Sequence, residues 1–322
     1  MKIIRQLGEF ENPLHKATFC TIGMFDGLHL GHQHVIKQTI HRAQQADGIS
    51  IAITFDQHPA RIVAPERAPA MIYPLSKRRA LLEASNFSFV WIIPFDRQFS
   101  EIPGNEFLER ITKWLSPLCY ICVGPDFHFG HKRSGDPQLL RDRASSLDYE
   151  LPEIIPVKHQ GGEVSSTAIR NLITEGKLDE ASHRLGRNYE ICGQVVRGKE
   201  VGRSIGFPTA NIDTTALALP PNGVYPVIAS ISGRTVNGVM NIGHRPSINQ
   251  SSTLRTAEVH LFDFHENLYD KYLEVRPLQR IRGEQKFPSL AALQDQIKQD
   301  IRTARQFLSQ PSRTEPVAVS AG

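Results

Sequence analysis

The chain has 322 residues, of which 40% are hydrophobic and 22% are charged, and its formal net charge is +4. This length predicts two domains, and the composition is that of a globular protein with enough apolar residues for two cores. The small net charge, without a block of lysines and arginines, excludes a polyanion-binding arm, and we expect no nucleic-acid partner.

A short apolar β-rich run, residues 18–25, ends in a glycine-broken turn, and helical spacing of apolar residues follows from Gly31. A strand, a tight turn and a helix start predict an anion site, because unpaired backbone N–H groups and the helix dipole both point at the turn. His29 and His32 lie in this turn and can donate hydrogen bonds to a phosphate. A metal site with His34 is the alternative, although no cysteine or carboxylate nearby completes a tetrahedral set.

Apolar runs alternate with helical patterns through the first half of the chain. Strand-like runs occupy residues 49–55, 87–94 and 120–124, and helical patterns occupy residues 76–84, 105–115 and 139–147. This alternation predicts an α/β fold with a parallel sheet and helices on both faces. Polar clusters at residues 26–32, 56–59 and 126–130 follow three strands, so we expect them to share one cleft at the carboxyl ends of the strands.

Three hydroxyl residues, Ser165, Ser166 and Thr167, open a further helix that carries Arg170 one turn on. A single hydroxyl at a helix start is usually an N-cap. Three hydroxyls followed by an arginine predict a second anion site, which suits the far end of a triphosphate.

The character of the chain changes near residue 187, after one more short helix at residues 178–187. Short strand-like runs with turn signals follow at residues 193–197, 223–230, 234–240, 257–262 and 273–278. They predict a small, mostly antiparallel barrel. A last helix is expected to pack on the barrel with a stripe formed by Leu290, Leu293, Ile297, Ile301, Ala304 and Leu308. Residues 310–322, rich in Ser, Pro and Ala, are expected to be a disordered tail.

Glycines recur every four residues at Gly198, Gly202 and Gly206, in the densest stretch of the chain. Such a loop can cradle phosphate with its amides, although it is neither a Walker A sequence nor a dinucleotide fingerprint. The loop leads to Thr209 and Asn211, whose alternate spacing places both on one side of an extended segment. Their oxygens, together with phosphates, are the ligands that Mg²⁺ prefers, and a plain hairpin with a glycine turn is the alternative.

Glu258 lies in the strand-like run at residues 257–263. A carboxylate on a strand beside a nucleotide loop can take a proton from an attacking hydroxyl. On the sequence alone a solvent-facing glutamate on an alternating strand is favoured. Phosphorylation of a hydroxyl needs a positioned nucleotide, Mg²⁺ and a base, however, and the glycine loop, Thr209, Asn211 and Glu258 could supply all three.

The cysteines of the chain, Cys20, Cys119, Cys122 and Cys192, lie mostly in apolar runs. The spacing of Cys119 and Cys122 falls within an expected strand, which favours packing over redox chemistry. The N-terminus has no apolar segment of signal length, and no run of about 18 apolar residues follows. We therefore expect a cytoplasmic protein that does not contact a membrane.

Several segments of the chain carry a family resemblance over nearly its whole length, up to about Leu308. They are TIGMFDGLHLGHQ, TFDQHP, VGPDFHFG, VSSTAIR, GRSIGFPTANI, NGVYPV, NIGHRPS and AEVHLFDF. The His-x-Gly-His motif is shared with many nucleotidyltransferases, VSSTAIR is more restrictive, and GFPTAN after such a domain is highly specific. In these segments the chain resembles the prokaryotic bifunctional riboflavin kinase/FMN adenylyltransferases, or FAD synthetases.

The resemblance implies a Rossmann-like nucleotidyltransferase domain at residues 1–184 and a riboflavin kinase barrel domain with a C-terminal helix at residues 185–309. The kinase would make FMN from riboflavin and ATP, and the other domain would join FMN to a second ATP, which gives FAD and pyrophosphate. Mg²⁺ would be the cofactor, and ATP the co-substrate of both reactions. His29 and His32 would stabilise the ATP phosphates, and Glu258 would be the base for the riboflavin 5′-hydroxyl.

The other site residues that the resemblance implies form three groups. ATP in adenylyl transfer would contact Gly23, Phe25, Asp26, Gly31, Ser165, Ser166, Thr167 and Arg170. The flavin and nucleotide would contact Asp56, His58, Pro59, Asp126 and Phe127. ATP of the kinase would contact Gly202, Arg203, Gly206, Phe207, Pro208, Thr209 and Asn211, and the metal would be held by Thr209 and Asn211.

The chain departs from the usual family sequence in the barrel half. Ser247 and then Gln250 stand where Thr and, shortly afterwards, Gly are usual, and Asp270 stands where Gly is usual. The change at Asp270 can reshape a loop on the flavin side.

Two other readings of the chain differ from a two-step enzyme. One is a single-activity nucleotidyltransferase whose barrel binds flavin without catalysis, and the other is a flavin-sensing regulatory module. A tRNA-related role lacks a basic surface interleaved with aromatic residues. The expected partners are the small molecules riboflavin, FMN, FAD and ATP, and the expected state is a monomer or a weak homo-oligomer.

Overall fold

The structure is a computed structural model that describes residues 2–5, 10–12, 14–159, 161–198, 202, 205–245 and 254–310. The chain divides into two compact units, one of Met1–Met71 and Leu75–Ser166 and one of Ile72–Pro74 and Thr167–Gly322. Within the described ranges, no helix is both long and apolar enough to cross a membrane. Predictions made for Arg203, Ser247, Gln250 and the tail from residue 311 lie outside the described residues.

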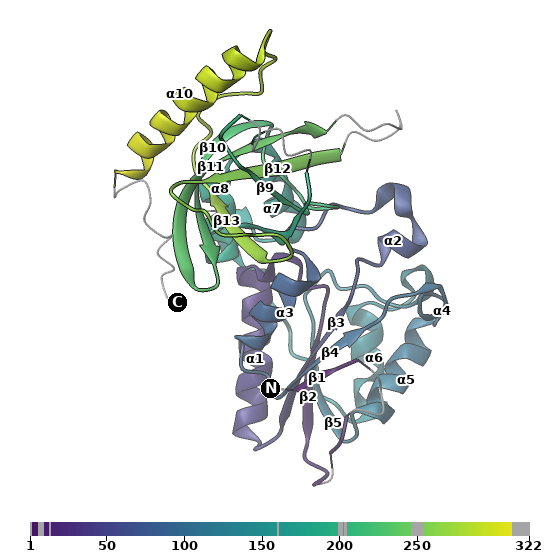
Figure 1. Cartoon of the computed structure of the whole chain (residues 1–322). Coiled ribbons are helices and arrows are strands. Elements are labelled where there is room, and N and C mark those ends of the chain that lie inside the picture. The colour runs from purple at the N-terminus through teal and green to yellow at the C-terminus, as the bar shows by residue number, and fades with distance from the viewer. Residues whose placement is uncertain are drawn as a thin grey trace. The chain divides into compact units, whose positions relative to one another are not determined.

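The first unit is built on a five-stranded parallel sheet with the strand order β1-β4-β3-β2-β5. Its strands are β1 (Lys2–Ile4), β2 (Thr18–Ile22), β3 (Ile49–Phe55), β4 (Phe89–Ile93) and β5 (Leu118–Cys122). The longer helices are α1 (Leu30–Gln45), α3 (Leu75–Glu83), α5 (Gly104–Trp114) and α6 (Pro137–Leu147), with α1 and α3 on one side of the sheet and α5 and α6 on the other (Figure 1). The expected α/β sheet with helices on both faces is confirmed.

Alternate side chains of the central strand β3 enter two different cores. Ile51 and Ile53 belong to a core that includes Ile111 of α5, and Ala52 belongs to a core that includes Ile36 of α1. A strand buried on both faces has a nearly continuous apolar sequence, and β3 (ISIAITF) fits this pattern, with only Ser50 and Thr54 polar.

Short elements complete the first unit. They are the 3₁₀ turns η2 (Asp26–Leu28), η3 (Pro65–Arg67) and η4 (His131–Arg133), the helices α2 (Ala60–Val63) and α4 (Arg97–Ser100), and the hairpin of β6 (Lys158–His159) and β7 (Gly162–Glu163). The sequence did not predict β1, which has three residues and pairs with β4 at the edge of the sheet.

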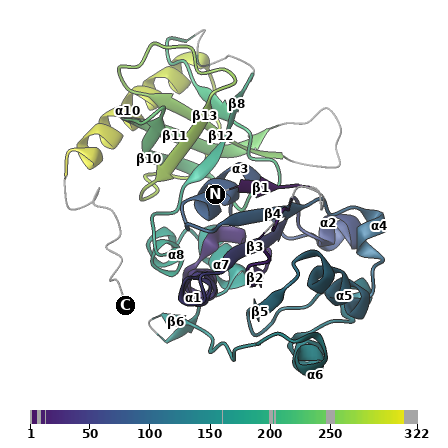
Figure 2. The same ribbon diagram turned by 90° about the horizontal axis from the view of Figure 1, so that it is seen from below.

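The second unit contains a closed antiparallel barrel, and the expected small antiparallel barrel is thereby confirmed (Figure 2). Its strand order is β10-β11-β12-β9-β8-β13. Its strands are β8 (Ile191–Val196), β9 (Ala210–Ile212), β10 (Gly223–Ile231), β11 (Arg234–Arg245), β12 (Leu254–Leu261) and β13 (Tyr272–Pro277). Helices α7 (Ser166–Glu175) and α8 (Leu178–Leu185) precede the barrel, and α10 (Leu290–Leu308) follows it.

The C-terminal helix α10 packs against β10 and β11 of the barrel. Ile301, Ala304 and Leu308 form a small core with barrel residues, as the apolar stripe predicted. The prediction is wrong for Leu290, which is 62% exposed, because the apolar contacts of the helix with the barrel are made farther along its length.

Candidate active sites

A cavity of about 250 Å³ lies in the first unit where β2 leads into α1. Many of the residues expected to bind ATP line it, namely Gly23, Phe25, His29, Gly31, His32, Ser165 and Ser166. The strand–turn–helix arrangement inferred from the sequence therefore encloses a space for a ligand.

The turn between β2 and α1 has a left-handed backbone at three residues, with φ of 48° at Phe25, 82° at Gly27 and 38° at Leu28. Asp26 is buried within this turn, and its carbonyl oxygen accepts a hydrogen bond of 2.9 Å from the Ser166 hydroxyl. Ser166 is thus tied to the turn within the first unit, and the expectation that the two segments bind one ligand stays a prediction.

His29 and His32 lie together on the cavity wall, with their rings stacked at 3.7 Å between centroids and 17° between planes. His29 caps α1, since its Nδ1 accepts a 3.3 Å hydrogen bond from the backbone N–H of His32. A neutral His29 ring therefore carries its proton on Nε2, where it can donate to an anion. A Cβ on Gly31 would lie 3.2 Å from His29 Nδ1, so a larger residue would crowd the imidazole.

A second and larger cavity in the first unit measures about 670 Å³. Aromatic rings form much of its wall, contributed by Phe55, Phe95, Phe99, Phe107, Phe127 and Phe129. His58 and Pro59 also line it, as the sequence led us to expect for a flavin contact. A wall of this kind suits a flat aromatic ligand.

The two cavities of the first unit share three wall residues, Met24, Asp126 and Phe127. Phe127 is half-buried and stacks on Phe129, with ring centroids 5.4 Å apart. Ligands that occupied both cavities would therefore meet at this wall.

Asp56 occupies a different place from the other expected ligands. Its Oδ1 accepts hydrogen bonds from the backbone N–H groups of Gln57 at 2.8 Å and Phe95 at 2.9 Å. Asp56 does not line either of the two cavities described above. Its carboxylate instead stabilises the loop after β3 through these two hydrogen bonds.

Thr167 and Arg170 lie on the turns of α7 that follow Ser166. They belong to the second compact unit, whereas Ser165 and Ser166 belong to the first. Their expected contact with nucleotide phosphates stays a prediction.

A cavity of about 280 Å³ lies in the second unit beside the barrel and α10. Gly202, Phe207, Thr209 and Glu258 line it, together with apolar residues of α10. Glu258 is half-buried on this wall. It is therefore not the solvent-facing glutamate that the sequence alone favoured.

Glu258 stands between two asparagines on neighbouring strands. The register of the barrel pairs it with Asn211 of β9 on one side and with Asn241 of β11 on the other. Residues directly opposite each other share a face of the sheet. A Cβ on Gly198 would lie 2.3 Å from Asn211 Nδ2, so the glycine loop packs closely on that amide.

This donor set fits a hard cation bound with phosphate oxygens. The side chains of Thr209, Asn211 and Glu258 offer a hydroxyl, an amide and a carboxylate oxygen, which are ligand types of Mg²⁺. Among the residues that the structure describes, no group of three or more His, Cys, Asp or Glu could hold a metal ion.

His260 orders the glycine loop and was missed by the sequence analysis. Its ring Nδ1 donates a 2.9 Å hydrogen bond to the carbonyl oxygen of Pro208, and its ring lies edge-on to Phe207. The bond sets the proton on Nδ1, because a carbonyl can only accept. His260 follows Glu258 by two positions on β12, so the period of a strand was the available signal.

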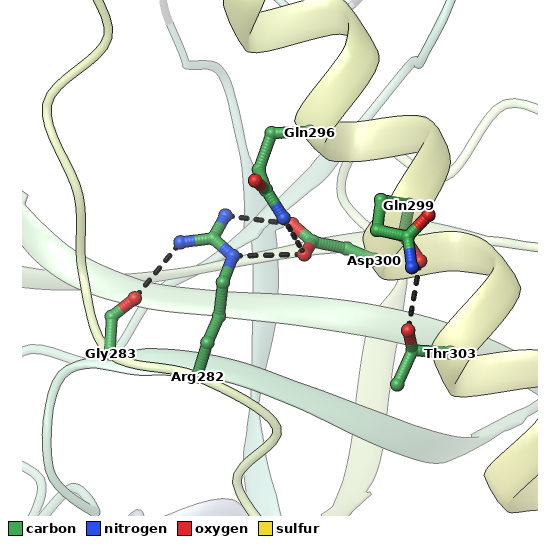
Figure 3. Close-up of polar contacts among 6 residues, drawn as sticks. All are labelled: Arg282, Gly283, Gln296, Gln299, Asp300 and Thr303. Carbon is green, nitrogen blue, oxygen red and sulfur yellow. Dashed lines mark hydrogen bonds and ion pairs between the residues drawn. The ribbon is translucent and has the colours of Figure 1, made fainter.

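An ion pair between Arg282 and Asp300 also lines the barrel cavity and was missed (Figure 3). Asp300 is 5% exposed and accepts bonds from Arg282 Nε at 2.9 Å, Arg282 Nη2 at 2.7 Å and Gln296 Nε2 at 2.9 Å. The pair connects the segment after β13 to α10. The sequence gives no motif for this ion pair, because its partners are 18 positions apart and lie in different segments.

Asp270, which stands where the family usually has glycine, takes a left-handed backbone conformation with φ of 63°. Its N–H donates to the carbonyl oxygen of Val195 at 3.1 Å, next to the start of β13. Glycine adopts this conformation more easily, and aspartate is among the residues that tolerate it.

Two family models match the chain. The model described as FAD synthetase matches residues 11–168, and the model described as riboflavin kinase matches residues 185–308. A protein named bifunctional riboflavin kinase/FMN adenylyltransferase from Haemophilus influenzae is 36% identical over 96% of this chain and 100% of its own length. Proteins of the same name from Pseudomonas fluorescens and Escherichia coli K12 are 35% and 32% identical, over 97% and 95% of this chain and 99% and 98% of their own lengths.

A solved structure agrees in fold. A crystal structure titled as a macrolide-efflux protein from Streptococcus pneumoniae matches with a TM-score of 0.75 at 28% identity, over 94% of this chain and 98% of that one. A parallel-sheet nucleotidyltransferase unit followed by a flavokinase barrel defines a class of flavin-nucleotide transferases. The chain belongs to the bifunctional riboflavin kinase/FMN adenylyltransferase family.

Proposed function

We propose that the chain makes FAD from riboflavin in two steps, phosphorylation by the barrel unit and adenylylation by the sheet unit. The observation that carries the proposal is the pair of cavities that share the wall of Met24, Asp126 and Phe127. One cavity contains the histidine turn and the other has aromatic walls. Adenylyl transfer requires a nucleotide and a flavin phosphate to meet in this way. The names of the full-length relatives and the two matching family models support it.

In the kinase step, Glu258 accepts the proton of the riboflavin 5′-hydroxyl as that oxygen attacks the γ-phosphorus of ATP. The bond from the γ-phosphorus to the β-phosphate oxygen breaks, and FMN and ADP are the products. Thr209 and Asn211 would hold Mg²⁺, which neutralises phosphate charge when it is bound. Gly202, Gly206, Phe207 and Pro208 shape the loop over the nucleotide, and Arg203 is expected to contact it.

In the adenylylation step, a phosphate oxygen of FMN attacks the α-phosphorus of a second ATP and pyrophosphate leaves. No protein nucleophile is needed, because the FMN phosphate is already ionised. His29, His32 and the N-terminus of α1 stabilise the charge that develops on the phosphates. The flavin ring occupies the aromatic cavity, and the α-phosphorus lies at the shared wall of Asp126 and Phe127. Thr167 and Arg170 stay predicted ligands of the outer phosphates.

We assign residues 1–184 to the adenylyltransferase and residues 185–309 to the kinase. The two matched ranges, 11–168 and 185–308, support this division. We expect a cytoplasmic enzyme, in line with cysteines that lie in apolar strands. We also expect a monomer or weak homo-oligomer without nucleic-acid or membrane partners.

The direct test is product analysis by chromatography after incubation of the purified chain with riboflavin, ATP and Mg²⁺. We expect FMN and ADP first, followed by FAD and pyrophosphate. A single-activity nucleotidyltransferase would convert added FMN and leave riboflavin unchanged. A flavin-sensing module would bind flavin without consuming ATP. Either outcome would contradict the proposal.

A further inference from the structure

Arg78 is a buried arginine in α3 that the two reaction steps do not use. The residue is only 2% exposed to solvent. The guanidinium donates from Nη1 to the carbonyl oxygens of Met24 at 3.0 Å and Phe55 at 3.1 Å, and from Nη2 to that of Asp56 at 2.9 Å. All three acceptors are backbone atoms.

These carbonyls belong to the ends of two neighbouring strands. β2 and β3 are parallel partners, with Ile22 opposite Ile53, and their carboxyl ends lead to the histidine turn and to the loop of His58. Met24 lines both cavities of the unit, and Phe55 lines the aromatic cavity. The helix α3 lies at this end of the sheet and packs against η2 (Figure 1). One side chain therefore holds together the nucleotide turn and the flavin loop.

We propose that Arg78 is a positioning residue for adenylyl transfer, which sets the nucleotide turn against the flavin loop so that the FMN phosphate and the α-phosphorus are in line. This inference rests on the proposed function. Arg78 does not touch the reacting atoms. It acts through the backbone of Met24, Phe55 and Asp56.

Charge and hydrogen-bond geometry explain why the position holds an arginine. Burial lowers the pKa of Arg78, and the nearby carboxylates of Asp26 and Asp56 oppose this shift and favour the charged form. A planar guanidinium can donate hydrogen bonds to carbonyls at the ends of two strands at once, whereas a lysine ammonium carries the same charge on a single nitrogen. A lysine at this position keeps the balance with Asp26 and Asp56 but cannot reproduce the fork.

A purely structural role predicts a different result from a positioning role. If Arg78 only stabilised the fold, its loss would lower the stability and weaken the binding of both substrates. If it aligns two otherwise intact subsites, each substrate binds normally and the chemical step slows. A misplacement of about 1 Å between reacting groups costs on the order of a hundredfold in rate.

The experiment compares Arg78→Lys and Arg78→Gln with the same substitutions at Arg79, in the full chain. Arg79 is the next residue of α3, and its Nε lies 2.9 Å from Glu83 Oε1 in an exposed ion pair, which makes it a matched control. For Arg78→Lys we expect kcat for FAD formation from added FMN to fall about tenfold to a hundredfold, with KM for FMN and ATP within about threefold of the wild type. Riboflavin phosphorylation by the barrel unit and both Arg79 variants should keep the wild-type rates.

The inference is wrong if Arg78→Lys keeps the wild-type kcat. It is also wrong if this variant loses flavin binding, measured by quenching of FMN fluorescence, together with a lowered thermal midpoint, because Arg78 would then be structural. Arg78→Gln tests the charge, and we expect it to be at least as slow as Arg78→Lys. Failure of the proposed function is distinguishable, since the wild-type chain would then make no FAD from FMN.

Discussion

Arg282 and Asp300 face each other with two parallel hydrogen bonds on the wall of the barrel cavity, at 2.9 Å and 2.7 Å (Figure 3). Their side chains are only 17% and 7% exposed, so the pair is largely removed from water. The guanidinium also donates to the carbonyl oxygen of Gly283 at 2.9 Å. The pair therefore fixes the segment after β13 to α10 on the wall of the cavity that also contains Glu258, the proposed base for the riboflavin 5′-hydroxyl.

Asp300→Asn should raise KM for riboflavin at least about tenfold. Removal of one charge from a buried pair costs about 3–5 kcal/mol, because the arginine is left without its counter-ion. FAD formation from added FMN should not change. Steady-state kinetics of both reactions and thermal unfolding measure these effects.

The matched control is Asp263→Asn, which breaks an ion pair with Arg305 of the same helix. Those side chains are 79% and 50% exposed, and a surface pair contributes about 0–1 kcal/mol. Equal losses of riboflavin affinity in the two variants would refute a specific role for Asp300.

His32→Ala should abolish FAD formation, by at least about a hundredfold, and leave FMN formation from riboflavin intact. His32 lies on the cavity at the turn between β2 and α1 and stacks on His29, so its loss removes a proposed phosphate ligand and exposes the partner ring. His34→Ala is the control, since His34 bonds to Gln38 on the next turn of α1. Loss of both activities in a folded His32→Ala protein would overturn the two-site assignment.

Glu258→Ala should give the reverse pattern. Riboflavin phosphorylation should stop because the 5′-hydroxyl loses its base, while added FMN should still be converted to FAD. The two products are separated by chromatography. Retention of kinase activity within about threefold of the wild type would show that Glu258 is not the base.

Gly198→Ala should reduce kinase activity at least about tenfold, because the new methyl group would displace the side chain of Asn211. A Cβ at this position would lie 2.3 Å from Asn211 Nδ2, which is closer than real contacts allow. Gly283→Ala is the control, because a Cβ at that position would have no neighbouring atom within 4 Å. A rise in the Mg²⁺ concentration needed for half-maximal rate would place the defect at the metal. An unchanged Gly198→Ala enzyme would argue against the role of Asn211.

Thiol titration at pH 8 should detect a single fast-reacting cysteine, Cys119. It is half-buried, whereas Cys20, Cys122 and Cys192 are buried. Burial raises the pKa of the Cys122 thiol to about 11 and raises the pKa of Cys20 and of Cys119 as well, which reduces the reactive thiolate at pH 8. Solvent access therefore distinguishes Cys119 from the three buried thiols. Cys119→Ser should remove the fast reaction. Two or more fast thiols, or a disulfide between Cys119 and Cys122, would contradict the packing assignment.

Much of the fold was readable from the sequence because its strands are buried on both faces or alternate in a regular way. β3 and β4 are apolar runs, and β13 alternates buried residues with more exposed ones, as a barrel strand does. β9 was predicted only as an extended segment at Thr209 and Asn211 and not as a barrel strand, because it has only three residues and a polar centre at Asn211. β11 was predicted to end at Met240 but extends to Arg245, since pairing with β12 sustains a polar stretch that has no intrinsic strand signal.

His29 and His32 were singled out by side-chain type and spacing, whereas the sequence alone favoured a solvent-facing Glu258, and the structure places all three on cavity walls. Their roles in the reactions stay predictions. Arg78 and Asp300 were not readable, because charged residues on helices are normally solvated and only tertiary packing buries them. Asp56 shows the opposite limit. A polar residue after a strand suggests a ligand contact, and the structure shows that its Oδ1 accepts hydrogen bonds from two backbone amides, while the ligand contact stays a prediction.

Met24, Asp126 and Phe127 line both cavities of the first unit, so a nucleotide and a flavin bound as proposed would share contacts with these three residues. Thermodynamic reciprocity then requires that any factor by which a nucleotide changes flavin affinity equals the factor by which flavin changes nucleotide affinity. Calorimetric titration of FMN with and without a non-hydrolysable ATP analogue would give this heterotropic coupling constant. A coupling constant of one would mean that the wall of Met24, Asp126 and Phe127 carries no binding energy between the two ligands.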